Sequence, residues 1–462
     1  MNLYRPIYHF LPEKNWMNDP NGVVFYKGEY HLFYQYNPNG YSWGTIHWGH
    51  AKSKDLVHWE HMPIALYPSE DKGELHCFSG CAVINGDEPT IFYTSIGEGK
   101  RHQSTGAEQW MAISKDDMVT WEKYDDNPVL TLDIHGGIEI KEWRDPFVWK
   151  EDESWFMVVG GSHNKKGCAL IYRSADLKNW EFLNILAEEE KDEIWECPNC
   201  FKLGDKYVLV YSPNEQVQYR IGTINKDYKF VTEYVSTLDY SGWEGFYAPN
   251  SLSDSSGRRI MWGWLTDVAR GEFNQCGEWS GVQSLPRILE IENNMLYMKP
   301  VKELEALRTN HKRYENVEIT ESWLPDAKGK ALEVIAEIET IDQLTSFSID
   351  VLASENGEEK TSIIYDSDKN SFSVNRKKSS LSGLCHDSEL SGKIILDKDE
   401  NLKLHIFVDH STIEVFANYK ETISTRVYPV REDSENIVFN LIKGKLLKVK
   451  SLDIWEMKSI WE

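Results

Sequence analysis

The chain has 462 residues, 41% of them hydrophobic and 13% aromatic, and its formal net charge is −24 at pH 7. A chain of this length can bury a large core, and we expect two domains. The negative charge argues against nucleic acid as a partner, because phosphate binding needs a basic face, and it disfavours an anionic membrane surface.

The N-terminus predicts a cytoplasmic protein; the alternative is a mature secreted chain that begins with an added Met. Residues 1–10 contain no apolar core of signal-peptide length, and no apolar run of about 18 residues occurs in the chain. Seven scattered cysteines predict no disulfide framework. The pairs Cys77/Cys81 and Cys197/Cys200 would suit a four-thiolate zinc site, but they lie far apart in the sequence, and we expect no metal.

The first distinctive element is the segment 16–22, Trp-Met-Asn-Asp-Pro-Asn-Gly. Aromatic and β-branched runs follow it at 23–26 and 30–36 around a Lys-Gly turn, which predicts a β-hairpin. The hairpin would hold Asp19 at the mouth of a strand, where a rigid sheet can aim its carboxylate. The alternative is a turn that only caps the hairpin.

A weak internal repeat follows the hairpin. A Ser-x-Asp pattern ending in Trp-Glu occurs at 53–60, 114–122 and 174–181. Its spacing of about 60 residues, filled with short strands, is typical of β-propeller blades, because one blade cannot bury both faces of its sheet. We therefore predict a five-bladed propeller over residues 1–298. Chance similarity among turns is the alternative. Strand-like runs fit this period at 90–94, 155–159, 207–211 and 259–264.

The character of the sequence changes after Pro286. Apolar residues at 301, 304 and 307 predict a short helix inside a linker, 299–314. Alternating runs in residues 315–462 predict a C-terminal β-sandwich, so the fold class is all-β. No dense polar motif occurs there, and we expect an accessory domain. The predicted strands are 331–339, 347–352, 361–365, 404–408, 412–416 and 424–430.

Polar motifs recur with the period of the blades. Because equivalent positions on successive blades converge at one end of the axis, we expect the motifs to face one funnel. Three of them carry an acid, and two are Phe-Ser-Gly and Phe-Tyr-Ala. The motifs are centred on Asp19, Ser79, Asp145, Glu196 and Tyr247.

Three converging acids among aromatic residues suit glycoside hydrolysis. One carboxylate attacks the anomeric carbon, and one carboxylic acid protonates the leaving oxygen. We expect repulsion among the acids, and apolar neighbours such as Trp195, to raise the pKa of the proton donor. The alternative is structural, with Arg144 and Asp145 as a buried ion pair and Glu196 as a turn residue.

Segments 16–22, 78–80, 144–146, 196–198 and 279–287 closely resemble the motifs of glycoside hydrolase family 32, the β-fructosidases. The resemblance covers essentially the whole chain, including 409–416 in the predicted sandwich. It implies a five-bladed propeller with a β-sandwich, no metal or organic cofactor, and hydrolysis through a covalent fructosyl-enzyme with retention. The implied substrates are terminal β-D-fructofuranosyl residues of sucrose or small fructooligosaccharides.

The resemblance also implies roles for individual residues. Asp19 is then the nucleophile, Glu196 the general acid/base and Asp145 the transition-state stabiliser. Retention implies about 5–5.5 Å between the nucleophile and acid carboxyl groups. The residues implied to bind substrate are Asn18, Gln35, Trp43, Phe78, Ser79, Arg144, Cys197, Tyr247 and Trp264.

The chain departs from the family pattern at positions that we expect near the funnel rim, on the leaving-group side. Cys81 follows Phe-Ser-Gly, Asn199 follows Glu-Cys-Pro, and Gly245 precedes Phe-Tyr-Ala, with Glu244 one place earlier. The sequence does not decide whether the preferred donor is sucrose, sucrose-6-phosphate, or an inulin-type or levan-type chain. A fructosyltransferase and an exo-inulinase or levanase are alternatives, whereas a non-catalytic fructan-binding protein would need a lost carboxylate. We expect a monomer or homodimer.

Overall fold

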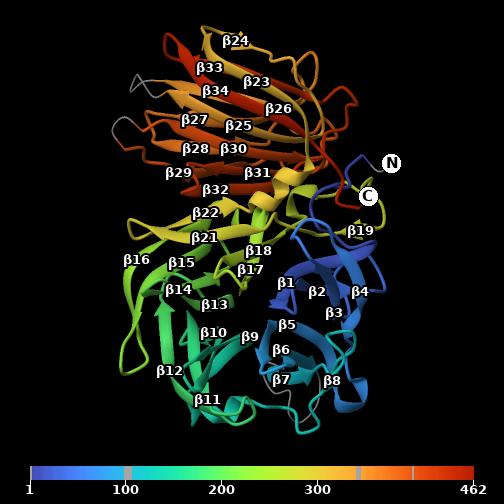
Figure 1. The fold of residues 1–462 in the computed structure, drawn as a ribbon, viewed down its shortest axis with the longest axis vertical. Helices are drawn as coiled ribbons and strands as arrows, with labels where there is room; N and C mark the ends of the chain where they lie inside the picture. The colour runs from blue at the N-terminus through green and yellow to red at the C-terminus, as the bar shows by residue number, and fades with distance from the viewer. Residues whose placement is uncertain (1–2, 98–106, 340–344, 398–399, 462) are drawn as a thin grey trace.

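The computed structural model describes residues 3–97, 107–339, 345–397 and 400–461. In these residues the chain folds almost entirely into β-strands, joined by turns and short 3-10 helices (Figure 1). No helix in the described part is long and apolar enough to cross a membrane.

The N-terminal unit contains five sheets of four or five strands each. Its first sheet holds β1 (Asn15–Tyr26), β2 (Glu29–Asn37), β3 (His47–Ser53), β4 (Glu60–Leu66) and β19 (Trp279–Ser280). The second holds β5 (Glu74–Asn85), β6 (Glu88–Gly97), β7 (Ala107–Ile113) and β8 (Glu122–Lys123), and the third holds β9 (Ile140–Glu151), β10 (Ser154–His163), β11 (Lys166–Ser174) and β12 (Trp180–Glu189). The fourth holds β13 (Glu196–Leu203), β14 (Lys206–Ser212), β15 (Val217–Ile224) and β16 (Phe230–Asp239). The fifth holds β17 (Phe246–Ser253), β18 (Arg259–Leu265), β20 (Val282–Gln283), β21 (Arg287–Glu292) and β22 (Met295–Pro300).

The first strands of these sheets form a closed ring. β1 contacts β5, β5 contacts β9, β9 contacts β13, β13 contacts β17, and β17 contacts β1 (Figure 1). The late strand β19 pairs in parallel with the start of β1, through Asn15 opposite Trp279, so a late segment of the N-terminal unit completes its first sheet. This arrangement is a β-propeller, as the sequence predicted.

The internal repeat corresponds to one kind of turn, between the third and fourth strands of the first three sheets. In each copy a serine Oγ donates to an aspartate Oδ1 two residues later at 3.0–3.1 Å, and a buried residue with positive φ follows. The repeat therefore reports blade architecture rather than chance. The three turns contain Ser53, Asp55 and Leu56; Ser114, Asp116 and Met118; and Ser174, Asp176 and Leu177.

The C-terminal unit is a sandwich of two six-stranded sheets, as predicted. One sheet contains β23 (Arg308–Ile319), β34 (Leu447–Met457), β25 (Ala331–Glu339), β30 (Leu402–Asp409), β31 (Thr412–Ala417) and β32 (Glu421–Arg426). The other contains β24 (Ser322–Trp323), β33 (Asn436–Lys443), β26 (Ser346–Ala353), β27 (Thr361–Asp366), β28 (Ser371–Asn375) and β29 (Glu389–Lys393).

Two local predictions at this unit were wrong. The linker 299–314 does not extend to 314, because β23 begins at Arg308 and pairs with β34; this edge strand is largely exposed, so its sequence shows little alternation. The strand predicted at 424–430 is β32, Glu421–Arg426. Tyr428 and Val430 leave the sheet and pack near Phe273 of the propeller.

The predicted short helix is the 3-10 helix η5 (Lys302–Leu307). Leu304 and Leu307 are buried in it, and Val301 directly before it is buried as well. A spacing of three apolar residues matches the three residues per turn of a 3-10 helix better than the 3.6 of an α-helix.

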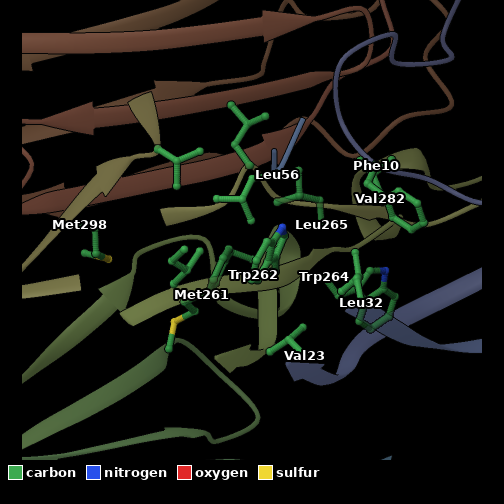
Figure 2. Close-up of a cluster of buried hydrophobic side chains, with 14 of the residues drawn as sticks. Phe10, Val23, Leu32, Leu56, Met261, Trp262, Trp264, Leu265, Val282 and Met298 are labelled. Atoms are coloured by element: carbon green, nitrogen blue, oxygen red, sulfur yellow. The ribbon is translucent and has the colours of Figure 1, made fainter. Parts of the chain in front are cut away.

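One buried apolar cluster joins the propeller to the sandwich (Figure 2). It includes Phe10 and Leu32 near the first sheet, Trp262 and Val282 of the fifth sheet, and Phe416 of the sandwich. Fully burying a side chain of this kind contributes about 1.5–3 kcal/mol. Separating the two units would therefore expose a continuous part of the core.

Candidate active site

Each of the five inner strands has a β-bulge at its motif. In every case two residues of the inner strand lie opposite one residue of its neighbour, and such a bulge re-aims side chains out of the pleat. The five bulges are at 18–19, 78–79, 145–146, 197–198 and 248–249. Segment 16–22 therefore lies inside β1, and the interpretation of it as a capping turn was wrong.

Prolines account for four of the five bulges. Pro146, Pro198 and Pro249 are the second bulge residues, and Pro20 directly follows the bulge of β1. Proline has no N–H to donate to a sheet ladder, so it is tolerated where pairing is interrupted. The residues before the first three of these prolines have left-handed φ values: 69° at Asp145, 47° at Cys197 and 47° at Ala248.

The bulges surround a cavity of about 490 Å³. Every predicted site residue except Ser79 lines it, and Ser79 lies behind Asp19. A larger cavity, of about 790 Å³, is lined by Trp110, Asp125 and Asp133 and contains none of the motifs. The smaller cavity is lined by Trp16, Asn18, Asp19, Gln35, Trp43, Phe78, Arg144, Asp145, Glu196, Cys197, Trp243, Tyr247, Ala248, Trp264, Asp267 and Val268.

Asp19 is held by a small polar network. Its Oδ2 accepts from Ser79 Oγ at 2.5 Å, and its Oδ1 accepts from Asn18 Nδ2 at 3.1 Å. Gln35 links both partners, because it donates to Ser79 Oγ at 2.5 Å and accepts from Asn18 Nδ2 at 2.7 Å. Burial raises the pKa of Asp19 to about 6, although the hydrogen bond from Ser79 opposes that rise. At neutral pH the carboxylate is therefore ionised and oriented.

Asp145 is the most enclosed of the three acids, with 5% of its surface exposed. The Cys197 N–H donates to its Oδ2 at 2.9 Å, and its own N–H donates to Thr94 Oγ1 at 2.8 Å. Burial raises the pKa of Asp145 to about 7, and the guanidinium of Arg144 opposes that rise. The negative charges of Glu196 and Asp19 raise it further.

Glu196 is anchored through both carboxylate oxygens. Its Oε1 accepts from Arg144 Nη2 at 2.8 Å and Nε at 3.3 Å, and its Oε2 accepts from the Tyr247 hydroxyl at 2.6 Å. Burial and the charge of Glu196 raise the pKa of Tyr247, so its phenol stays a donor. Trp195, next to Glu196 in the chain, is fully buried and stacks on Tyr211 with ring centroids 3.8 Å apart.

Cys197 lies between two of the acids. Its Sγ donates to Asp19 Oδ2 at 3.6 Å and to Asp145 Oδ2 at 3.5 Å. Burial, together with the neighbouring acids, raises its pKa well above the usual range, which keeps the thiol protonated. The described residues contain no group of three or more His, Cys, Asp or Glu side chains placed to hold a metal ion.

Aromatic rings form two walls of the cavity. Trp264 contacts Trp16 at 5.8 Å and Trp243 at 5.7 Å between ring centroids. Trp43 forms the second wall. Its side chain is 54% exposed, and its ring centroid lies 5.1 Å from that of His76.

The sequence motifs missed some residues that line the cavity. Asp267 and Val268 follow β18 at the start of the 3-10 helix η4 (Val268–Arg270), where the sequence has no motif, and Trp243 stands just before Phe-Tyr-Ala. The tryptophan could have been noticed from its place beside Glu244 and Gly245. Asp267 and Val268 gave no local signal. Trp16 and Ala248 lie inside the motifs but were not singled out.

Two of the departures from the family pattern, Cys81 and Asn199, do not line the cavity, so the rim position expected for them was wrong. Cys81 Sγ accepts the Val148 N–H at 3.1 Å, farther along β5. Asn199 is buried and donates to the carbonyls of Cys197 and Pro249 at 3.1 and 2.9 Å. Glu244 lies at the rim but turns toward the sandwich, because Ser388 and Arg376 of that unit bind it.

Three carboxylates, a guanidinium and aromatic walls around one cavity define a site of the glycoside hydrolase class. Residues 9–300 match "Glycosyl hydrolases family 32 N-terminal domain", and residues 303–456 match "Glycosyl hydrolases family 32 C terminal". The chain therefore belongs to glycoside hydrolase family 32, and the predicted family is confirmed.

Known relatives cover nearly the whole chain. It is 31% identical over 490 residues to a sucrose-6-phosphate hydrolase of Zymomonas mobilis, covering 99% of this chain and 91% of that protein. It is 34% identical over 505 residues to a levanase of Bacillus subtilis, and the match covers 99% of this chain and 71% of the levanase. A variant of the Bombyx mori family 32 β-fructofuranosidase in complex with sucrose has a similar fold, with a TM-score of 0.83 and 30% sequence identity. The match covers 100% of this chain and 96% of that one.

Proposed function

We propose that this protein is a retaining β-fructosidase that releases terminal β-D-fructofuranosyl residues from sucrose or small fructooligosaccharides. The observation that carries the proposal is the convergence of Asp19, Asp145 and Glu196, from three different sheets, on one aromatic-walled cavity. The relatives that act on sucrose-6-phosphate and the bound sucrose of the Bombyx mori structure support a fructose-terminated donor.

In the first step the Asp19 carboxylate attacks the anomeric carbon of fructose. The bond from that carbon to the leaving oxygen breaks while Glu196 gives its proton to that oxygen. Asp145 binds fructose hydroxyls and stabilises the positive charge that develops on the ring. The product of this step is a fructosyl ester on Asp19 and a free leaving sugar.

In the second step water attacks the same carbon. Glu196, now ionised, takes a proton from the water, and the ester bond to Asp19 breaks to return the free carboxylate. Two inversions give net retention. Asn18, Gln35, Ser79 and Arg144 hold the acids in place, and no step requires a cofactor.

A fructosyltransferase or an exo-acting inulinase or levanase would use the same covalent intermediate with another acceptor or a longer donor. A non-catalytic binding protein is disfavoured because all three carboxylates are present and oriented. Products from a panel of donors separate these possibilities: free fructose indicates hydrolysis, longer oligosaccharides at high sucrose indicate transfer, and neither indicates binding alone.

We also propose that residues 1–298 form the catalytic unit, that residues 315–462 are accessory, and that the protein acts in the cytoplasm as a monomer or homodimer. Buried free thiols at Cys77, Cys168 and Cys200 suit a reducing compartment. Cell fractionation and light scattering test the location and the oligomeric state.

The proposal is tested with Asp19→Asn and Glu196→Gln, assayed on sucrose, sucrose-6-phosphate, 1-kestose and levan. We expect the parent to release fructose from at least one donor and each variant to lose several orders of magnitude in kcat while remaining folded. Asp152→Asn, in the exposed β9–β10 turn, is the matched control. Near-parental turnover in either active-site variant would contradict the roles proposed for Asp19 and Glu196.

A further inference from the structure

The 3-10 helix η3 (Gly242–Glu244) places Trp243 on the cavity rim, where 46% of its surface is exposed. Its ring meets Tyr247 edge-on, with centroids 5.0 Å apart and planes at 90°. Tyr247 in turn binds Glu196. Because the proton donor must lie beside the leaving oxygen, an exposed ring packed against the Tyr247–Glu196 pair lies on the leaving-group side of the cavity.

The residue that follows Trp243 is held by the sandwich rather than by the propeller. Glu244 Oε2 accepts from Ser388 Oγ at 2.6 Å and pairs with Nη2 of Arg376. The Arg376 side chain is 1% exposed, and its Nη1 donates to Thr425 Oγ1 of β32 at 2.9 Å. An ion pair with one buried partner in a fixed geometry holds its chain segment more firmly than a surface pair does.

At Gly245, the next residue, the backbone itself packs directly against the sandwich. A Cβ added to Gly245 would lie 2.0 Å from the carbonyl oxygen of Ser424 in β32 and 2.5 Å from Ser241 Cβ. Only glycine permits this close approach. The departure from the family pattern at Gly245 and Glu244 therefore has a structural reason, which is contact with β32.

A second part of the rim is held in the same way. Asp267 lines the cavity, and its Oδ1 accepts from Arg426 Nη1 and from the Tyr428 hydroxyl, both at 3.1 Å. Arg426 belongs to β32, and Tyr428 follows it. Two rim segments that flank the aromatic wall are thus tied to one strand of the sandwich.

We propose that Arg376 and Ser388, acting through Glu244, position Trp243 as a wall that binds the ring of a sugar leaving group. The sandwich would then set donor preference in addition to packing against the propeller. The chemistry fits, because the C–H face of a sugar ring packs on an indole, whereas a leaving group without a ring offers little to that wall. The inference rests on the proposed β-fructosidase function.

The test compares sucrose with methyl β-D-fructofuranoside, whose leaving group is methanol. In Trp243→Ala we expect the ratio of kcat/KM for sucrose to that for the methyl fructoside to fall about tenfold. Arg376→Gln and Glu244→Ala should lower the same ratio about threefold to tenfold. Combined with Trp243→Ala, they should add little, because all three act through one contact.

The control is Arg313→Gln, an exposed sandwich arginine that pairs with Glu315 and Asp453 inside its own unit. Its ratio should stay parental. Arg376 is buried, so its loss can impair folding. Glu244→Ala therefore repeats the test at the other residue of the ion pair, whose side chain is 41% exposed. A parental ratio in Glu244→Ala, or equal losses on both donors in Trp243→Ala, would overturn the inference.

Hydrogen exchange of residues 242–245 gives a readout that does not depend on activity. We expect faster exchange there in Arg376→Gln and Glu244→Ala than in the parent and in Arg313→Gln. Unchanged exchange would overturn the positioning role. If the parent releases fructose from neither donor, the proposed function fails, and the exchange experiment still decides whether the ion pair orders the segment.

Discussion

Arg144 on β9 and Glu196 on β13 are joined across two sheets by a 2.8 Å contact between Nη2 and Oε1. Glu142, two residues before Arg144, binds Nη1 of the same guanidinium at 2.6 Å. The guanidinium is thus fixed from both sides, and it fixes the carboxyl group that the mechanism needs as proton donor.

The Tyr247 hydroxyl is expected to matter for turnover. In Tyr247→Phe, Glu196 loses the 2.6 Å hydrogen bond at Oε2, and a hydrogen bond to a charged group is worth about 1.5–3 kcal/mol. We expect kcat to fall by about 10-fold to 100-fold. Steady-state kinetics on sucrose measure this, with Tyr297→Phe on β22 as the matched control. A kcat within about twofold of the parent would show that the hydroxyl does not support Glu196.

The pH dependence of kcat/KM should follow Asp19. Its pKa is raised to about 6 by burial, and only the ionised carboxylate attacks. We therefore expect kcat/KM to fall as the pH drops below about 6. A pH–rate profile on sucrose tests this expectation; a profile that stays flat down to about pH 4 would contradict it.

Asp145 should make the folded state less stable as the pH rises. Its folded-state pKa, about 7, lies above the ordinary value of 3.8, so its stabilising contribution is full below about pH 4 and is lost as the pH rises toward 7. Asp145→Asn removes this penalty. We expect the variant to gain about 1–4 kcal/mol over the parent at pH 8 and little at pH 4.

Denaturant unfolding at both pH values measures this difference. Asp152→Asn, in an exposed turn, serves as the control and should show the same shift from the parent at both values. An equal gain for Asp145→Asn at pH 4 and pH 8 would contradict the account.

His9, at the interface of the two units, should also make the folded state less stable as the pH rises, but over a higher pH range. It contacts Asp409 Oδ2 at 2.9 Å and Glu414 Oε1 at 3.1 Å; burial lowers its pKa, but these hydrogen bonds outweigh burial and raise it above 6.5. Its stabilising contribution is therefore full below about pH 6.5 and is lost as the pH rises through the folded-state pKa. In His9→Gln we expect the loss of unfolding free energy relative to the parent to shrink between about pH 6 and pH 9. A loss that does not change over this range would contradict the prediction.

Removal of the sandwich should cause aggregation. A chain ending at Leu307 would expose the cluster around Trp262 and leave Arg287 without Glu414, which it binds at 2.6 Å with both side chains fully buried. An exposed apolar core favours association. We expect an insoluble product or large species in size-exclusion chromatography, whereas a soluble, active monomeric fragment would contradict the shared core.

The residues that could be predicted from the sequence are those fixed by local patterns. Asp19 and Asp145 stand beside prolines and Glu196 stands two residues before one, all at blade spacing, and each bulge at these motifs is built by its own strand. Tyr247 likewise belongs to a motif at blade spacing, beside the bulge of β17.

What could not be predicted depends on partners distant in the chain. Arg376 and Ser388 of the sandwich bind the Glu244 side chain and set its orientation, and no residue near 244 in the sequence indicates these partners. Arg308 begins a strand because β34, at the far end of the chain, pairs with it. Trp195 was expected to act as an apolar neighbour of the acids, but its ring stacks on Tyr211, a partner that the local sequence does not indicate.

The central claim is that Asp19 forms the fructosyl-enzyme. Acid quenching during turnover of sucrose, followed by peptide mass spectrometry, tests it most directly. We predict that the peptide containing Asp19 carries the mass of one anhydrohexose, and that the adduct is absent from Asp19→Asn. An adduct on a different acid, or the same adduct in Asp19→Asn, would contradict the mechanism.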